Sequence, residues 1–520
     1  MSVRARSAGA REPASGWIER IERLGNALPD PITLFALGTA AVFLASWFAA
    51  RAGWSCNVPA ASGAQRVEAA RNLLSAEGFR WLATDLVSIF VRFPPLGLVL
   101  TASIGVAVAE KSGFLSSAMR AALVYVPRVL LTPATLLVGI CSTMAADAGF
   151  VVLPPLAAAV YRSVGRSAAL GIATVTAGIA GGFNANLFLT SQDPLLAGMS
   201  TQAANILDPS YSVNPACNWW FKIVSTLVLM LVGWFVSERI VAPKLAGPGA
   251  SEKEQLDGLL APAERRGLFF GLGTMAVLLA LFVLCQRAEW GFLHDPPPQP
   301  GSPLAAPVWI RSIVALIVAI FFAPGLAYGI TAGSIRSDRD VARMLADYFG
   351  VLAAYVVLAF FASLMVAAFE RSNLGILLAV KGGDELAGLG LPTWVLLVAF
   401  VFLSISLDLF VVSMSAKWAL LAPIFVPLFM GLGIAPELTQ AAYRVGDSLA
   451  NPVSPLNPYL VIVLAFLRRQ DEKSGLGTLI SLLAPFALAF ALTWIPLLLA
   501  WAALGIPLGP GGPLVYPPGR

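Results

Sequence analysis

Six charged residues lie in otherwise apolar stretches of this 520-residue sequence, and they are its first candidates for chemistry: Asp147, Asp193, Asp408, Lys417, Arg444 and Asp447. An ionisable side chain at the centre of an isolated membrane helix costs about 2.5–3.5 kcal/mol on insertion scales. Each one therefore needs a partner or a function. Four of the six stand at or next to places where Gly, Pro, Asn or Ser interrupts an apolar stretch, so we expect these breaks to form a binding site.

Asp193 lies in "NANLFLTSQDPLLAG", from Asn184 to Gly198, which gathers amides, hydroxyls, a carboxylate and a proline after an apolar segment. Pro194 lacks a backbone donor and disfavours helix at the residue before it. We therefore expect Asp193 on exposed backbone beside polar neighbours such as Asn186, where a polar solute or an ion can bind. The alternative is a solvated turn at the end of a complete span.

Arg444 and Asp447 lie three residues apart on a predicted helix and are close enough to pair with each other. One interpretation is a structural ion pair. In the other, the planar guanidinium of Arg444 binds a carboxylate or sulfonyl group, and Asp447 takes part in coupling to an ion or a proton. The interpretations are compatible, because a pair that opens to admit a solute acts as a gate.

Trp418 stands beside Lys417 and Ser415 at another polar break and offers a flat ring with one donor. It could stack on an aromatic solute. The alternative for a lone tryptophan is an anchor at the membrane interface, which a position at the middle of the membrane would exclude. Asp408 is expected to pair with Lys417 or with another helix.

The coupling ion is left open between a proton and sodium, and no cofactor is expected. The one histidine, His294, falls in a Pro-rich loop, so proton coupling would have to use carboxylates whose pKa burial can raise. Sodium would bind near the oxygen-bearing side chains at the two broken helices, namely Asn184, Asn186, Asp447 and Asn451.

Composition places these residues in an integral membrane protein. Of the chain, 58% is hydrophobic and 12% is charged, whereas a soluble protein has about 25% charged residues. Apolar windows of about 20 residues, the length of a membrane span, recur along the sequence. Basic residues gather in the N-terminal segment and in alternate loops, which the positive-inside rule assigns to the cytoplasm. The net charge of +5 therefore needs no nucleic-acid partner.

Two polar breaks recur in the same order in the two halves of the sequence. "CSTMAADAGFVVLPPLAAAV" resembles "VSMSAKWALLAPIFVPLFMG", and further on "ANLFLTSQDPLL" resembles "ANPVSPLNPYL". Non-helical backbone at membrane depth is tolerated only inside protein or beside a wet cavity. We therefore expect each half to hold a re-entrant hairpin followed by a broken helix, as in inverted-repeat secondary transporters. Ordinary Pro and Gly kinks could explain one break, but not four in matched order.

This interpretation divides the chain into five parts. They are a cytoplasmic segment (1–27), a first repeat (28–240) with a hairpin near 128–163 and a broken helix near 168–200, a cytoplasmic linker (241–265), a second repeat (266–470) with a hairpin near 391–432 and a broken helix near 437–467, and a last helix with a tail (471–520).

Other classes of function are disfavoured. An intramembrane aspartyl protease would need a GxGD context, but the candidate sites read "RVGD" and "KGGD". HExxH and GxSxG are missing from the sequence, so no enzymatic activity is expected and an intramembrane hydrolase is the remote alternative. A channel would not need two breaks in each half.

Eight segments resemble the AbgT family of p-aminobenzoyl-glutamate transporters and related antimetabolite exporters: "ERLGNALPDPITLF", "FPPLGLVL", "ADAGFVVLPPLAAAV", "SQDPLLAGMSTQAA", "VNPACNWWF", "ERSNLGILLAVKG", "SAKWALLAPIFVPLF" and "YRVGDSLANPVSPLNPY". The resemblance implies an all-α protein of about nine transmembrane helices and two re-entrant hairpins, forming a homodimer in the bacterial inner membrane. It implies ion-driven export of aminobenzoates or sulfonamides, or uptake of p-aminobenzoyl-glutamate. The alternative is a sodium-coupled importer of a dicarboxylate-like solute.

The family's functional positions fall on seven residues of this chain: Asp193, Ser415, Trp418, Pro436, Arg444, Asp447 and Pro455. One departure is the first hairpin tip, "CSTMAAD", where the family pattern would place Asn after Ser. Alanine in place of Asp193, Trp418 or Arg444 is expected to abolish transport and to leave expression and dimerisation intact.

Overall fold

The computed structural model describes residues 31–59, 65–124, 126–145, 148–245, 260–295, 307–408, 411, 413–454 and 456–517. The regular secondary structure of this part of the chain is helical except for one two-stranded antiparallel sheet, β1 (Ser55–Pro59) and β2 (Gln65–Ala69). The prediction of an all-α protein missed this small sheet, which follows the first helix. Its loop is too polar for a span, and period-2 strands of five residues give a weak signal.

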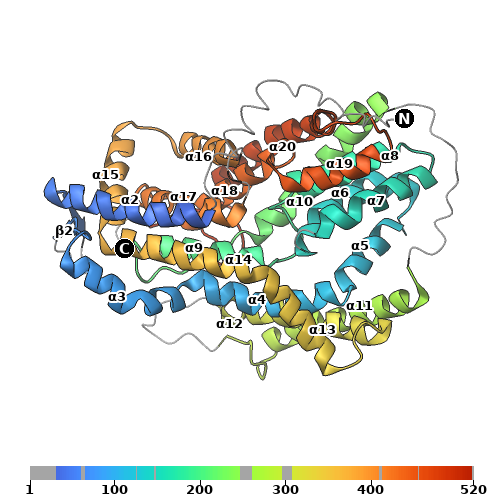
Figure 1. Cartoon of the computed structure of the whole chain (residues 1–520), viewed down its shortest axis with the longest axis horizontal. Coiled ribbons are helices and arrows are strands. Elements are labelled where there is room, and N and C mark those ends of the chain that lie inside the picture. Colours follow the sequence, from blue (N-terminus) through green and yellow to red (C-terminus); the bar gives the residue numbers. More distant parts are fainter. Residues whose placement is uncertain are drawn as a thin grey trace, which may run out of the picture.

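The long helices form a bundle whose axes run mostly along the long dimension of the molecule (Figure 1). They are α2 (Pro31–Arg51), α3 (Ala76–Val91) continued by α4 (Pro94–Lys111), α10 (Trp219–Val236), α11 (Pro262–Arg287), α13 (Ile313–Ala332), α14 (Asp338–Arg371) and α20 (Leu476–Leu504). Among the described residues, eight helices are long and apolar enough to cross a membrane, or nine with a pair bent by 117° at residues 114–144. The chain is therefore a multi-pass membrane protein, as predicted.

Two helical hairpins enter this bundle. Hairpin 1 consists of α6 (Leu131–Cys141), a 3-10 turn (Ser142–Ala145) and α7 (Ala148–Ser163). Hairpin 2 consists of α16 (Thr393–Asp408) and α17 (Met414–Gly431). Figure 1 shows α6 and α7 in one half of the molecule and α16 and α17 in the other. The predicted hairpins are thus present as helix pairs, although the predicted candidate Asp147 lies outside the described residues.

Each hairpin is followed by a helix in two pieces. In the first half, α8 (Ala168–Gly181) ends at consecutive glycines and α9 (Gln192–Ala204) begins after ten non-helical residues. In the second half, α18 (Pro436–Ala450) gives way to α19 (Pro458–Arg468). Proline stands at the first position of α18 and α19, where its missing N–H costs no hydrogen bond.

The two halves pack their hairpins on their broken helices in the same way. In the first, α6 crosses α8 where Gly139 meets Gly178, and a Cβ on Gly139 would lie 2.7 Å from the carbonyl oxygen of Val175. In the second, α16 crosses α18 at Gly446, where a Cβ would lie 2.6 Å from the Cβ of Ser404. Small residues allow such close helix crossings in membranes, so glycine holds each hairpin against its broken helix.

Gly446→Ala is expected to lower the thermal unfolding midpoint of the detergent-purified protein. The added methyl must push α16 away from α18, and overpacking of this kind costs about 1–3 kcal/mol. Gly477→Ala is the matched control, because nothing lies within 4 Å of a Cβ at this helical position in α20. A Gly446→Ala protein that melts at or above the wild-type temperature would contradict the close crossing.

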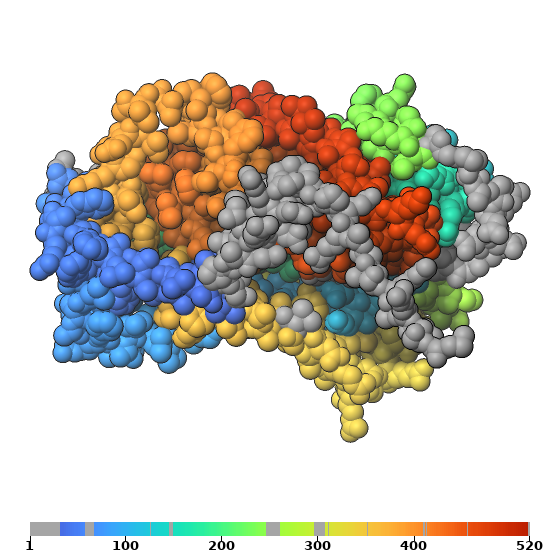
Figure 2. Space-filling view, turned by 45° about the horizontal axis from the view of Figure 1, so that its top comes forward, coloured from blue at the N-terminus to red at the C-terminus, as the bar shows by residue number. Residues whose placement is uncertain are grey.

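Shorter elements connect the bundle: α5 (Phe114–Val124), η1 (Arg128–Leu130), η3 (Ser237–Val241), η4 (Ala242–Leu245), α12 (Val308–Arg311) and α15 (Leu374–Gly388). Figure 2 shows the N-terminal helices (blue) and the region of α15 and α16 (orange) at one end of the molecule.

The long helix α14 begins with a capping box. The backbone N–H of Arg336 and the hydroxyl of Ser337 donate hydrogen bonds to the Asp340 carboxylate and so hold the pKa of Asp340 below its usual range.

Candidate substrate and ion site

A cavity of about 460 Å³ lies where the two hairpin tips meet the first break. The tip of hairpin 1 contributes Thr143, the tip of hairpin 2 contributes Ser413 and Ser415, and the start of α9 contributes Ser191 and Gln192. Four aromatic residues also line the cavity, together with mostly apolar side chains: Phe183, Tyr348, Tyr355 and Tyr459. We call this space the central cavity. Its hydroxyls, amide and rings could bind a solute with polar and aromatic parts, and its volume lies in the range of small-molecule sites.

Next to the central cavity, Asp193 binds two buried cations. Lys222 Nζ lies 2.7 Å from Oδ2 of Asp193, and Arg444 Nη2 lies 2.8 Å from Oδ1. All three side chains are at most 3% exposed. The backbone N–H of Thr190 donates to the same carboxylate at 2.7 Å, so the turn before α9 holds it in place. Asp193, Lys222 and Arg444 form the Asp193 cluster, which carries a net charge of +1.

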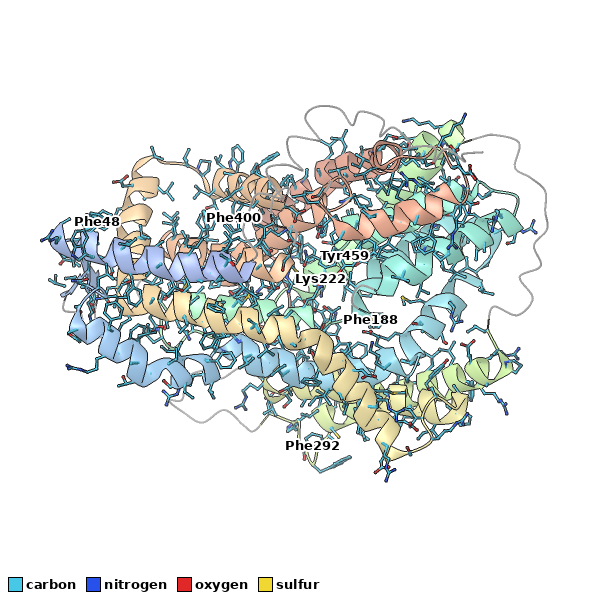
Figure 3. All side chains as sticks on the ribbon, in the orientation of Figure 1. Phe48, Phe188, Lys222, Phe292, Phe400 and Tyr459 are labelled. Carbon is cyan, nitrogen blue, oxygen red and sulfur yellow. The ribbon has the colours of Figure 1, made fainter. Side chains whose placement is uncertain are left out.

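Lys222 was missed by the sequence analysis. It lies in the first turn of α10, and Figure 3 shows it near the middle of the long axis of the molecule, far from Phe48 at one end. Its ammonium also lies 3.4 Å from the carbonyl oxygen of Phe188 in the first break. The signal was available, because Lys222 is the one charged residue in the apolar stretch Trp219–Val236.

A second charged group joins hairpin 2 to α18. Lys417 Nζ lies 2.6 Å from Oδ1 of Asp447 and also pairs with Asp408. Asn184 of the first break donates to Oδ2 of Asp447 at 2.8 Å, and the Tyr443 hydroxyl donates to Oδ1 at 3.0 Å. Asp408, Lys417 and Asp447 form the Asp447 cluster, which is buried and carries a net charge of −1.

Of the two interpretations of Arg444 and Asp447, the ion pair between them is not present in the structure, because each binds another residue. The two side chains share one face of α18 but bind different neighbours: Arg444 reaches α9, where it pairs with Asp193, and Asp447 pairs with Lys417 of hairpin 2. Three residues on a helix bring two side chains near one face, but a buried charge binds whichever opposite charge the neighbouring helices present. The alternative pairing considered for Asp408, with Lys417, is the one present.

The sequence is similar to those of known proteins over nearly the whole chain. A family model described as "AbgT putative transporter family" matches residues 16–516. The p-aminobenzoyl-glutamate transport protein of Escherichia coli (strain K12) is 34% identical over 502 residues, which is 96% of each chain. The chain belongs to the AbgT family.

Two solved structures of AbgT transporters are similar in fold. The Neisseria gonorrhoeae MtrF structure, described as illuminating a class of antimetabolite efflux pumps, matches with a TM-score of 0.88 and 39% identity, covering 96% of this chain and all of that one. The Alcanivorax borkumensis YdaH transporter matches with a TM-score of 0.86 and 38% identity, covering 93% of this chain and all of that one. Membership of this transporter family makes the chain a transporter, not an enzyme.

Trp418, one of the positions suggested by the AbgT resemblance, is fully buried. Its ring stacks on Tyr443 with centroids 4.6 Å apart, and its indole N–H donates to Ser200 of α9 at 3.1 Å. One ring face is therefore occupied by protein in this conformation, and Trp418 joins hairpin 2 to α9 and α18. Its truncation to alanine would cost about 3–5 kcal/mol in lost packing, so lost transport in that variant would not by itself show a contact with solute.

The other suggested positions are spread over the same region. Ser415 lines the central cavity, and buried Pro436 begins α18. Asn186 donates to Thr143 at 3.0 Å, which ties the first break to hairpin 1, and the carbonyl of buried Asn451 accepts from Asn457 in the second break. Pro455 lies outside the described residues.

One polar stripe of α18 links the two clusters, and part of it was also missed. Gln440 accepts from Arg444 at 3.2 Å and from Asn218 at 2.8 Å, and it donates to Ser200 at 2.8 Å. Further toward the start of α18, buried Glu437 accepts from the Tyr211 hydroxyl at 2.9 Å. The spacing of Glu437, Gln440, Arg444 and Asp447 places them on one helical face, a pattern that the sequence alone shows.

Proposed function

We propose that this chain is an ion-gradient-driven secondary transporter of p-aminobenzoyl-glutamate or related aminobenzoates and sulfonamides, and that it exports them. The main support for this proposal is that both hairpin tips and the first break line one cavity, and that two buried clusters of opposite net charge lie beside it. The E. coli relative is named for p-aminobenzoyl-glutamate transport, and MtrF is described among efflux pumps. Both support the proposed solute class.

The Asp193 cluster supports an anionic or strongly accepting solute. Its two cations share one carboxylate, and the guanidinium of Arg444 is suited to a carboxylate or a sulfonyl group. The seryl hydroxyls and Gln192 in the central cavity can bond an amide or amine, and the tyrosine rings can cover an aromatic ring. A benzoyl-amide carboxylate has all of these groups.

The Asp447 cluster supports cation coupling. Its two carboxylates share one ammonium group, and the side-chain oxygen of Asn184 has no hydrogen-bond partner among the described residues. One proton or one sodium ion would neutralise the cluster. We propose that this cluster binds the coupling ion together with Asn184 of the first break and Asn451 of the second break. Asn186 belongs to the contact with hairpin 1 instead.

The same charges favour a second candidate, a sodium-coupled importer of a dicarboxylate-like solute. An anion at the Asp193 cluster and a cation at the Asp447 cluster would each neutralise a buried net charge, and binding of either one would favour binding of the other. If the solute and the cation bind together, the inward cation gradient drives the solute into the cell. If they compete for the protein, each cation that enters is exchanged for solute that leaves.

We also propose the setting of this transport. By the positive-inside rule, we assign the N-terminal segment and the α13–α14 turn to the cytoplasm of a bacterial cell. In this proposed orientation, hairpin 1 enters from the cytoplasmic side of the inner membrane and hairpin 2 from the opposite side. By its resemblance to the family, the protein is a homodimer. The molar mass of the detergent-purified protein, measured by light scattering, tests the dimer.

Proteoliposomes test the transport itself. With radiolabelled p-aminobenzoyl-glutamate, we expect movement against its own gradient when a proton or a sodium gradient is imposed, and collapse of that movement when the gradient is dissipated. The sign of movement separates exporter from importer, and the two gradients imposed separately identify the ion. Arg444→Gln should abolish the flux, and the exposed control Arg339→Gln should not. Flux that ignores both gradients would contradict the proposal.

A further inference from the structure

A second cavity, of about 700 Å³, lies apart from the central cavity. It is enclosed by the sheet and α3, the α3–α4 junction, the end of α9 and the end of α14, and we call it the Arg92 pocket. It shares no lining residue with the central cavity. In the proposed orientation, it opens on the extracytoplasmic side, at the end of the molecule where Figure 2 shows the blue N-terminal helices.

Helix α9 connects the two cavities. Its first residue, Gln192, lines the central cavity, and Gln202 lines the Arg92 pocket near its last turn. Ten residues of helix span about 15 Å. The Arg92 pocket is therefore only about 15 Å along α9 from the central cavity. A solute that leaves the central cavity toward this end of the bundle, or enters from this end, passes close to the pocket.

Three arginines give the Arg92 pocket its anion-binding chemistry. Nη2 of Arg371 lies 3.6 Å from Oε1 of Glu77, and Cζ of the same guanidinium lies 6.0 Å from the centre of the Trp81 ring. Arg71 and Arg92 are exposed, and within the described part of the chain their guanidinium groups have no carboxylate partner. A planar guanidinium binds a carboxylate with two parallel hydrogen bonds, so this side of the pocket can bind one or two carboxylates.

Acceptors line the same pocket, and they narrow the class of ligand. Glu68, Asp85 and Glu370 are present in its wall, so the pocket carries no excess of positive charge. Carboxylates repel a simple anion but accept hydrogen bonds from amine and amide N–H groups. The pocket therefore suits a ligand with carboxylates at one end, an aromatic ring that can lie on Trp81, and N–H donors at the other end.

We propose that the Arg92 pocket is a second binding site for the transported solute, an aromatic amine bearing an amide-linked carboxylate, and that it is occupied from the extracytoplasmic side. This inference rests on the proposed function. It assigns to Arg71, Arg92 and Trp81 a role in binding the solute outside the central cavity, as a place of release during export or of capture during import.

Equilibrium dialysis of the purified full-length protein with radiolabelled p-aminobenzoyl-glutamate tests the inference. Wild-type protein is expected to bind two equivalents per chain. Arg71→Gln/Arg92→Gln should weaken one of them at least 10-fold and leave the other, and Arg444→Gln should do the reverse. Trp81→Ala tests the same pocket through a different contact. Arg80→Gln, an exposed arginine on α3 that does not line the pocket, should bind two equivalents.

The outcomes separate this inference from the proposed function. A single equivalent that disappears in Arg444→Gln and persists in Arg71→Gln/Arg92→Gln would overturn the second site and leave the proposed transport intact. Absence of any binding to the wild-type protein would overturn both. Unfolding midpoints of Arg71→Gln/Arg92→Gln and Trp81→Ala equal to that of the wild type would show that their lost binding comes from the pocket and not from a loss of fold.

Discussion

Asp193→Asn is expected to abolish gradient-driven transport and to lower the thermal stability of the protein. The substitution keeps the shape of the side chain but leaves Lys222 and Arg444 buried with no carboxylate between them, which raises the net charge of the Asp193 cluster from +1 to +2. Removing one partner of a buried ion pair costs about 3–5 kcal/mol. Flux into proteoliposomes and the unfolding midpoint in detergent measure the two effects.

A compensated variant separates stability from function. Asp193→Asn/Lys222→Met returns the net charge of the cluster to +1, so its unfolding midpoint should recover toward that of the wild type while transport stays lost. Asp338→Asn, an exposed carboxylate at the start of α14, is the neutral control. Normal transport in Asp193→Asn would show that the Asp193 cluster only supports the fold.

Asp447→Asn is expected to uncouple transport from the ion gradient. The Asp447 cluster then becomes neutral without a bound cation, because Lys417 keeps Asp408 as its partner. We expect gradient-driven accumulation to fall about 100-fold, which corresponds to about 2.8 kcal/mol of lost coupling free energy. Exchange of labelled for unlabelled solute across the same liposomes, with no ion gradient, should persist because the Asp193 cluster and the central cavity are unchanged.

The exchange assay makes this prediction specific to coupling. Loss of both accumulation and exchange would indicate that Asp447 is needed for solute binding or for folding. Gradient-driven accumulation equal to that of the wild type would show that the coupling ion binds elsewhere. Asp384→Asn, an exposed carboxylate on α15, should change neither measurement.

Much of the membrane architecture was predictable from sequence because the bilayer imposes local rules. Spans of about 20 apolar residues follow from its thickness, and a polar break inside an apolar stretch is rare enough to indicate protein-lined or hydrated surroundings. For this reason the paired breaks around Asp193 and around Asn451 could be located in advance, as could the importance of Arg444 and Asp447. The same rule would also have selected Lys222 and Glu437 in advance, because each is a charged residue within or next to an apolar stretch.

The pairing of the charges was decided by tertiary structure alone. The sequence places Arg444 beside Asp447 and Lys417 near Asp408, but it does not say that α9 and α10 bring Asp193 and Lys222 to Arg444, or that Tyr443 covers one face of Trp418. Periodicity determines which residues share a face of one helix, whereas the partner of a buried charge depends on which helices cross there. Here, α9 and α10 bring Asp193 and Lys222 to Arg444, and hairpin 2 brings Asp408 and Lys417 to Asp447, which divides six buried charges into one positive and one negative cluster.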